Sequence, residues 1–115
     1  MKLKYPIILL AATLSVNTCL AASPAGNAIK NWRTNCLSCH GKDGKANTKA
    51  GRKSKTKDLT DAAYQATFTD DEAFKSIKEG MKRDGKKLMK PYKDKLTDDE
   101  IKDLVSFARK FNKSK

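Results

Sequence analysis

The residues best suited to cofactor or metal chemistry lie in one short stretch, residues 36–40, which reads Cys-Leu-Ser-Cys-His. Cys36 and Cys39 are three positions apart, and the only histidine of the chain, His40, follows directly. At the end of a helix, positions three and four apart share a face. Two thiols and an imidazole would therefore reach the same neighbouring group, and Gly41 would let the backbone turn away close to it.

Several kinds of site could use these side chains. Zinc needs four ligands, and apart from these three the chain after residue 21 contains no Cys or His. A thioredoxin-like Cys-x-x-Cys requires a βαβ unit, which the sequence does not indicate, and a chance match in a solvated loop is the simplest alternative. Cys-x-x-Cys-His is the attachment signature of c-type haem, whose two vinyl groups form thioethers with the cysteines. The sequence therefore predicts one haem c, bound covalently through Cys36 and Cys39, with His40 as an axial ligand of its iron.

The second axial ligand would have to come from another part of the chain. The candidates are Met81, Met89 and the lysines. Met89 lies two residues before Pro91, whose ring fixes the local backbone as a rigid ligand loop requires. Met81 lies at the end of an expected helix, where an apolar side chain is more simply part of the core. Because Met/His ligation is usual in electron-transfer haem proteins, we favour Met89 as the second ligand. The alternative role for Met89 is that of a flexible side chain that fills the core.

The first residues have the features of a secretory signal peptide. Two lysines precede an uncharged, mostly apolar run over residues 7–14, and mostly small residues follow. The run is too short and too interrupted to span a bilayer well, which is against the alternative of an uncleaved anchor. A lipoprotein anchored through Cys19 is a second alternative. We predict that residues 1–21 are a cleaved signal peptide and that residues 22–115 form one domain in the periplasm, with no stable membrane insertion.

The expected domain is small and polar. The full chain of 115 residues has a mean hydropathy of −0.70, and removal of the apolar signal makes the remainder more polar still. Small domains with thin cores usually need a disulfide, a metal or a cofactor. A disulfide between Cys36 and Cys39 would close a loop too short to constrain much of the chain. We therefore expect the haem itself to complete the core.

Three helices are expected to surround this group. The first runs from about residue 25 to 36, the second from Thr69 to Gly80, and the third begins at Thr97. Thr-Asp-Asp-Glu stands at the start of the last two and is typical of a capping box. The third helix carries one apolar stripe at helical spacing, which consists of Ile101, Leu104, Val105, Ala108 and Phe111.

The rest of the chain is expected to be loop, apart from a short helix that could form over residues 61–66. Residues 41–58 are rich in Lys, Gly and Thr, and residues 81–96 contain Gly85 and Pro91. Long ordered loops in small domains are usually functional. No alternating pattern typical of strands is evident, so the predicted fold class is all-α, with three to four helices and long intervening loops.

Together these motifs resemble the class I c-type cytochromes, the small monohaem proteins of the bacterial periplasm. The resemblance covers the chain from about residue 25 onward and rests on residues 36–44, 88–92 and 96–101. It implies the small cytochrome c fold around one covalently attached haem, and it implies that Met89 is the distal ligand.

The resemblance also implies how the terminal helices pack. In this family the first and last helices cross near a small residue and an aromatic one, which here are Ala28 and Trp32, against Leu104 and Phe107. The chain departs from many relatives in having no proline in residues 41–60. Those relatives use a proline carbonyl there to orient the ligand imidazole. The sequence of this chain therefore does not identify the group that accepts a hydrogen bond from His40.

The expected function is one-electron transfer, because an iron with both axial positions filled has no open site for a substrate. The protein would then be an electron carrier and not an enzyme. The alternative is a haem protein with an open distal site, which would bind a small ligand or catalyse a reaction.

The charge distribution suggests a class of partner. The formal net charge is +12, or +10 without the two lysines of the signal peptide. Residues 42–57 hold seven Lys or Arg against one acidic residue, and residues 75–95 hold nine against three. Such a field favours acidic partners, so we expect a monomer that docks acidic redox proteins. A nucleic-acid or membrane-surface binder is the alternative class, but the expected export and the absence of a recognisable nucleic-acid motif are against it.

Overall fold

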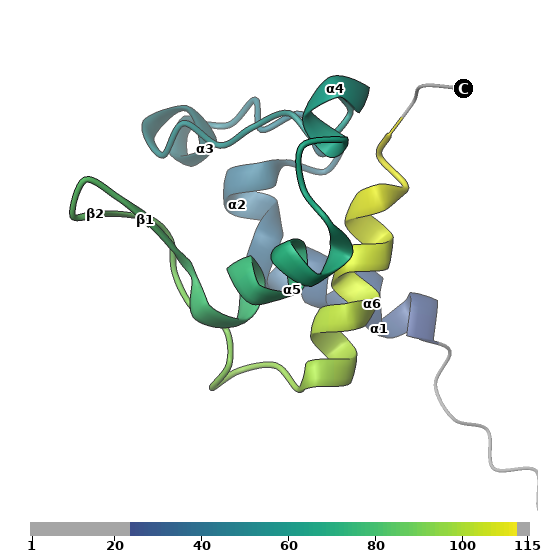
Figure 1. Ribbon diagram of the computed structural model, residues 1–115. Coiled ribbons are helices and arrows are strands. Elements are labelled where there is room, and N and C mark those ends of the chain that lie inside the picture. The colour runs from purple at the N-terminus through teal and green to yellow at the C-terminus, as the bar shows by residue number, and fades with distance from the viewer. Residues whose placement is uncertain (1–23, 113–115) are drawn as a thin grey trace, which may run out of the picture.

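The computed structural model describes residues 24–112, and the expected signal peptide lies outside them. In chain order the elements are α1 (Pro24–Asn31), the π-helical turn η1 (Trp32–Cys36), α2 (Leu37–His40), α3 (Lys49–Lys53), α4 (Ala62–Gln65), α5 (Asp70–Glu79), β1 (Met81–Arg83), β2 (Lys86–Met89) and α6 (Asp98–Arg109) (Figure 1). None of the described helices is long and apolar enough to cross a membrane. The element order shows that the described chain is mostly helical, as the sequence predicted.

The first three elements form one helical segment that ends at His40. The sequence predicted a helix end near Cys36, and the structure carries the helix four residues further. Within it, the N–H of Leu37 donates to the carbonyl of Trp32, five residues back, which is the spacing of a π-helical turn. Gly41, with φ of 78°, ends the helix directly after His40.

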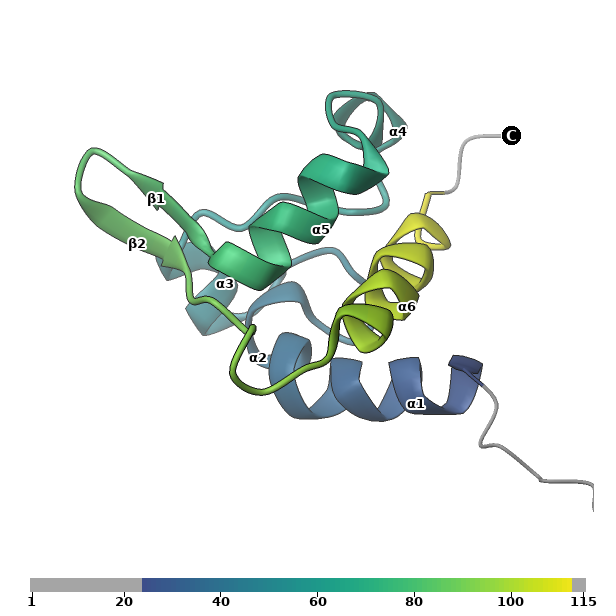
Figure 2. The same cartoon turned by 60° about the horizontal axis from the view of Figure 1, so that its bottom comes forward.

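The first and last helices cross and form the centre of the core (Figure 2). Ala28 and Trp32 are buried in the first helical segment, and Leu104 is buried in α6. The ring centroid of Trp32 lies 5.3 Å from that of Phe107 and 5.1 Å from that of Phe111. These contacts confirm the crossing predicted from the family resemblance.

Both predicted helix caps are present, but only one is a complete capping box. In α5, the Thr69 hydroxyl accepts from the N–H of Glu72 and the Glu72 carboxylate accepts from the N–H of Thr69. In α6, Thr97 caps the helix in the same way, whereas the Glu100 carboxylate accepts from Nδ2 of Asn31 at 2.9 Å. The second motif therefore also ties α6 to α1, which local sequence does not indicate.

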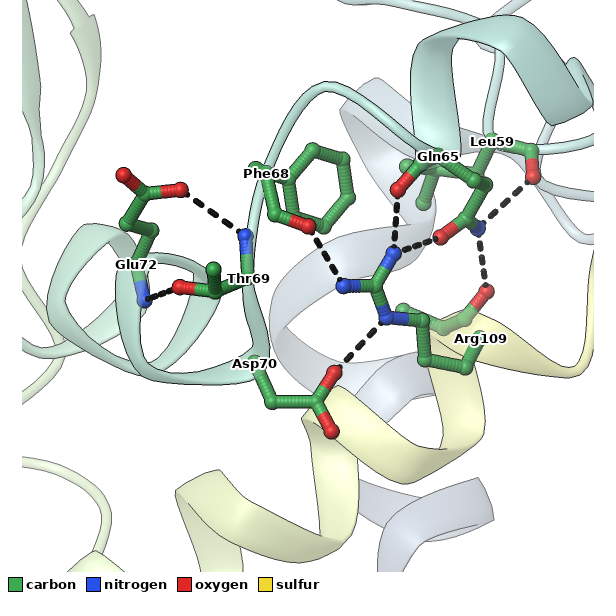
Figure 3. Close-up of polar contacts among 8 residues, drawn as sticks. Leu59, Gln65, Phe68, Thr69, Asp70, Glu72 and Arg109 are labelled. Atoms are coloured by element: carbon green, nitrogen blue, oxygen red, sulfur yellow. Dashed lines mark hydrogen bonds and ion pairs between the residues drawn. The ribbon is translucent and has the colours of Figure 1, made fainter.

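Arg109, the last residue of α6, holds the segment between α4 and α5 against the helix (Figure 3). Its guanidinium donates to the carbonyl and the side-chain oxygen of Gln65, to the carbonyl of Phe68 and to the carboxylate of Asp70. It also lies over the Phe68 ring, 4.3 Å from the centroid. Gln65 is 2% exposed, and its amide nitrogen donates to two backbone carbonyls. The buried polar groups of this contact are therefore satisfied.

Residues 81–89 form a small β-hairpin within the mostly helical fold, so the expectation of a loop is wrong there. β1 and β2 pair antiparallel and project from the helices (Figures 1 and 2). Asp84 and Gly85 join them with φ of 50° and 73°, as a type I′ turn requires. Each strand has only three or four residues and β1 is exposed throughout, so no alternating pattern marks it in the sequence. The short helix α3 likewise lies in an expected loop.

Candidate haem-binding site

The helical segment brings the three predicted attachment residues onto its last turn. Cys36 is buried and Cys39 is half-buried, and both are free thiols. Burial raises the pKa of the Cys36 thiol to about 12, and the neighbouring Cys39 adds to the rise. Among the described residues no group of three or more His, Cys, Asp or Glu side chains could hold a metal ion. This finding is against the zinc-site alternative.

The carbonyl groups at the end of this helix all find hydrogen-bond donors. The N–H of Gly41 donates to Leu37, and the N–H of Ala46 donates to His40, both at 2.9 Å. The Thr48 hydroxyl donates to the carbonyl of Ser38 at 2.7 Å, with the carbonyl of Cys39 more distant at 3.2 Å. The last carbonyls of a helix have no partner within it, so residues 46–48 hold the attachment turn in place.

Gly51 allows α3 to approach that turn closely. A Cβ atom at this position would lie 2.3 Å from the carbonyl oxygen of Cys39 and 2.6 Å from that of Ala46. Thr48 also caps α3, because its hydroxyl accepts from the N–H of Gly51 at 2.9 Å. Sequence reasoning missed these residues, since a Lys- and Thr-rich segment gives no signal of such a contact.

His40 is held against Trp32 at the base of the site. The two ring centroids lie 5.4 Å apart, and the indole N–H of Trp32 donates to the carbonyl of Gly41 at 3.1 Å. Burial lowers the pKa of His40, which favours the neutral imidazole that binds metals. Within the described residues, Nδ1 of His40 is a buried polar atom without a hydrogen-bond partner. Over residues 24–112, no side chain or carbonyl takes the place of the expected proline carbonyl.

Tyr92 connects the hairpin's exit to the attachment helix. Its side chain is 5% exposed, and its hydroxyl donates to the carbonyl of Asn35 at 2.8 Å. Its N–H donates to the carbonyl of Ile77 in α5 at 3.0 Å. Burial raises the pKa of Tyr92 to about 12, with smaller contributions from Cys36 and Cys39. The segment that follows Met89 is therefore anchored on both α5 and η1.

The two candidate methionines lie in different environments. Met89 is half-buried and packs against the core cluster that includes Cys36. Met81 is 40% exposed, so the expectation that it belongs to the core is wrong. Gly80 ends α5 with φ of 77° and turns the chain into β1, which takes Met81 off the apolar face of the helix. A register shift leaves Leu88 without a partner, and Leu88 and Met89 are both half-buried in succession, as a β-bulge allows.

The residues present fit a covalently attached haem. Two cysteines and a histidine share one helical turn, and burial lowers the pKa of that histidine. Half-buried apolar side chains pack against the core cluster that includes Cys36; among them are Leu37, Tyr64, Phe74, Ile77 and Met89. Thiols, an imidazole and an apolar surrounding are the groups by which proteins hold haem c.

The comparisons with known proteins agree with this description. The family described as cytochrome c oxidase, cbb3-type, subunit III matches residues 24–107. The solved structure of the KustC0563 c-type cytochrome is 35% identical, with a TM-score of 0.68, and the match covers 75% of this chain and 98% of that chain. A mutant form of the same cytochrome matches at 34% identity with a TM-score of 0.66, over 75% and 99% of the two chains. No curated protein sequence matches significantly. The chain has the small cytochrome c fold and belongs to the c-type cytochromes, as a monohaem domain like subunit III of the cbb3-type oxidases.

Proposed function

We propose that this protein is a periplasmic electron carrier with one covalent haem c. The haem, when bound, supplies a reversible one-electron change at its iron. Members of this family are typically electron carriers and are usually periplasmic. The observation that carries the proposal is the Cys-x-x-Cys-His turn, in which the carbonyls of Leu37, Ser38 and His40 accept hydrogen bonds from residues that follow the turn. A rigid turn of this kind holds an electron-transfer centre in one geometry.

Each residue of the turn has a distinct role in this proposal. Cys36 and Cys39 would form the two thioethers, and His40 would be the first axial ligand. The Thr48 hydroxyl donates to the carbonyl of Ser38, and the Trp32 ring packs against the imidazole of His40. The protein thus positions the cofactor and excludes water from it, while the cofactor carries the electron.

Met89 is proposed as the second axial ligand. It packs against the cluster that contains Cys36, and Tyr92, three residues later, is bonded to the carbonyl of Asn35. Three residues span at most about 11 Å when fully extended, so this anchor keeps Met89 near the attachment helix. The alternative is a haem with an open distal site, in which Met89 is only a core residue and the protein binds a small ligand or acts as a catalyst.

The two methionines provide a matched test because they are partners in the hairpin register. Met89→Ala should abolish the sulfur-to-iron charge-transfer band of the oxidised protein and allow external ligands to bind the iron. Met81→Ala should leave both properties unchanged. The reverse result would transfer the role to Met81, and no effect of either substitution would favour a lysine or an open site.

We also propose that basic side chains guide acidic redox partners to this carrier. The positive charge is concentrated in residues 42–57 and 75–95, which follow the attachment turn and include Met89. A field of this kind raises encounter rates and weakens as salt rises. The rate of electron transfer to an acidic acceptor should therefore fall with ionic strength, whereas the rate to a basic acceptor should not. The same dependence of the electron-transfer rate on ionic strength for both acceptors would contradict this proposal.

A further inference from the structure

The β-hairpin places its basic side chains opposite one another. In the register of the two strands, Lys82 pairs with Lys87 and Arg83 pairs with Lys86. Residues directly opposite in an antiparallel pair share a face, and like charges there are destabilising. Successive residues of a strand point to opposite faces. Each face of the hairpin therefore carries one repelling pair of cations.

The protein itself does not neutralise these four charges. All four residues are exposed, and among the ion pairs of residues 24–112 none involves Lys82, Arg83, Lys86 or Lys87. A two-stranded hairpin is only marginally stable in water, so such repulsion is a local cost with no compensation inside the described chain. Negative groups from another molecule would remove it.

We infer that the hairpin is the docking element of this carrier and that its partner is a protein with an acidic groove. Cations on both faces fit carboxylates on two walls better than one flat acidic patch. The inference rests on the proposed carrier function and assigns its docking to residues 82–87. An anionic membrane is the less suitable partner, because surface-binding segments pair basic residues with several large apolar ones, and the exposed large apolar residue of this hairpin is Met81.

The position of the hairpin gives docking a consequence for the haem site. Met89 ends β2, four residues from the turn, and its backbone pairs with Met81 at the base of the hairpin. A partner that relieves the repulsion between the strands would stabilise the segment that holds Met89. Docking should therefore strengthen the proposed sulfur ligand as well as bring the partner close to it.

The test is a titration of the haem-loaded, reduced protein with a ten-residue glutamate peptide at low salt, followed by amide chemical shifts. We expect the largest shifts in residues 82–90. Lys82→Gln with Lys87→Gln, and Arg83→Gln with Lys86→Gln, should each lower the affinity about tenfold. The matched control is Lys30→Gln with Lys110→Gln, which removes the same charge from two exposed residues outside the two basic segments and should lower affinity less than threefold.

A charge reversal separates docking from stability. Lys87→Glu would place a carboxylate opposite Lys82 and should raise the denaturation midpoint slightly while it weakens peptide binding. Lys30→Glu changes the net charge equally and should leave the hairpin unaffected. Loss of binding with an unchanged or raised midpoint cannot be explained by unfolding.

Four outcomes would overturn the inference. The first is an equal loss of peptide affinity in the hairpin and control variants, and the second is a loss of affinity from only one of the two cross-strand pairs. The third is tighter binding of the protein to phosphatidylglycerol vesicles than to the peptide. The fourth is unchanged peptide affinity of the hairpin variants together with new self-association. The last result would mean that the lysines only prevent edge pairing of the strands. Peptide binding does not depend on electron transfer, so a missing sulfur band or an irreversible iron couple would refute the proposed function separately.

Discussion

Replacement of Tyr92 by Phe tests how the ligand segment is attached to the haem helix. The substitution removes only the hydroxyl that donates to the carbonyl of Asn35 at 2.8 Å, and it keeps the ring of a side chain that is 5% exposed. Loss of one such hydrogen bond, with its acceptor left in a partly buried position, costs about 1–1.5 kcal/mol. At pH 7 the variant should therefore be less stable by this amount.

The difference should shrink at alkaline pH. Burial, with smaller contributions from Cys36 and Cys39, raises the pKa of Tyr92 to about 12 from an ordinary value of 10.0. Between these values the unfolded chain loses the phenol proton while the folded chain keeps it, so the stabilisation is complete below pH 10 and is lost as pH rises through 12. At pH 11 the loss reaches at most about 1.4 kcal/mol. In the loaded protein the thioether sulfurs carry no charge, and burial remains as the cause.

The assay is guanidinium unfolding of the haem-loaded protein and its Tyr92→Phe variant at pH 7, 9 and 11, followed by circular dichroism. The two midpoints should differ at pH 7 and 9 and should approach each other at pH 11, because Phe cannot ionise. The sulfur charge-transfer band of the variant should also be lost at a lower denaturant concentration. A constant difference in midpoint across this pH range, or no difference at pH 7, would refute the proposed role of the hydroxyl.

Two other predictions concern the core. Arg109→Ala should destabilise the loaded protein by about 2–3 kcal/mol, because it leaves partly buried acceptors of the 65–68 segment unpaired. Asp70→Asn should cost less than about 1 kcal/mol, since that carboxylate is 73% exposed. Equal losses in denaturation midpoint would reduce the contact to a surface ion pair. Cys36→Ala together with Cys39→Ala should give a largely unfolded chain. Ile101 and Leu104 are the largest fully buried side chains of the described core, so the core without haem is small. Native-like helicity with cooperative melting would contradict this expectation.

Local patterns were sufficient to predict much of the fold. The Thr-Asp-Asp-Glu sequences mark the starts of α5 and α6 because a cap is a contact within four residues. Trp32 meets Phe107 as the family resemblance implied. The hairpin was missed because a short, fully exposed strand needs no apolar alternation. Its Asp84-Gly85 turn was the one available signal.

The sequence by itself determined which side chains the proposed attachment turn presents, because Cys36, Cys39 and His40 lie within about one turn of helix. Only the tertiary structure decided what holds that turn and which of the two methionines packs against the core. Thr48 and Tyr92 bond carbonyls 10 and 57 residues away in the chain, and backbone carbonyls look alike in every sequence. Met81 and Met89 differ by burial alone, which depends on how Gly80 turns the chain away from α5. Such contacts arise from packing between distant segments, and no local pattern encodes them.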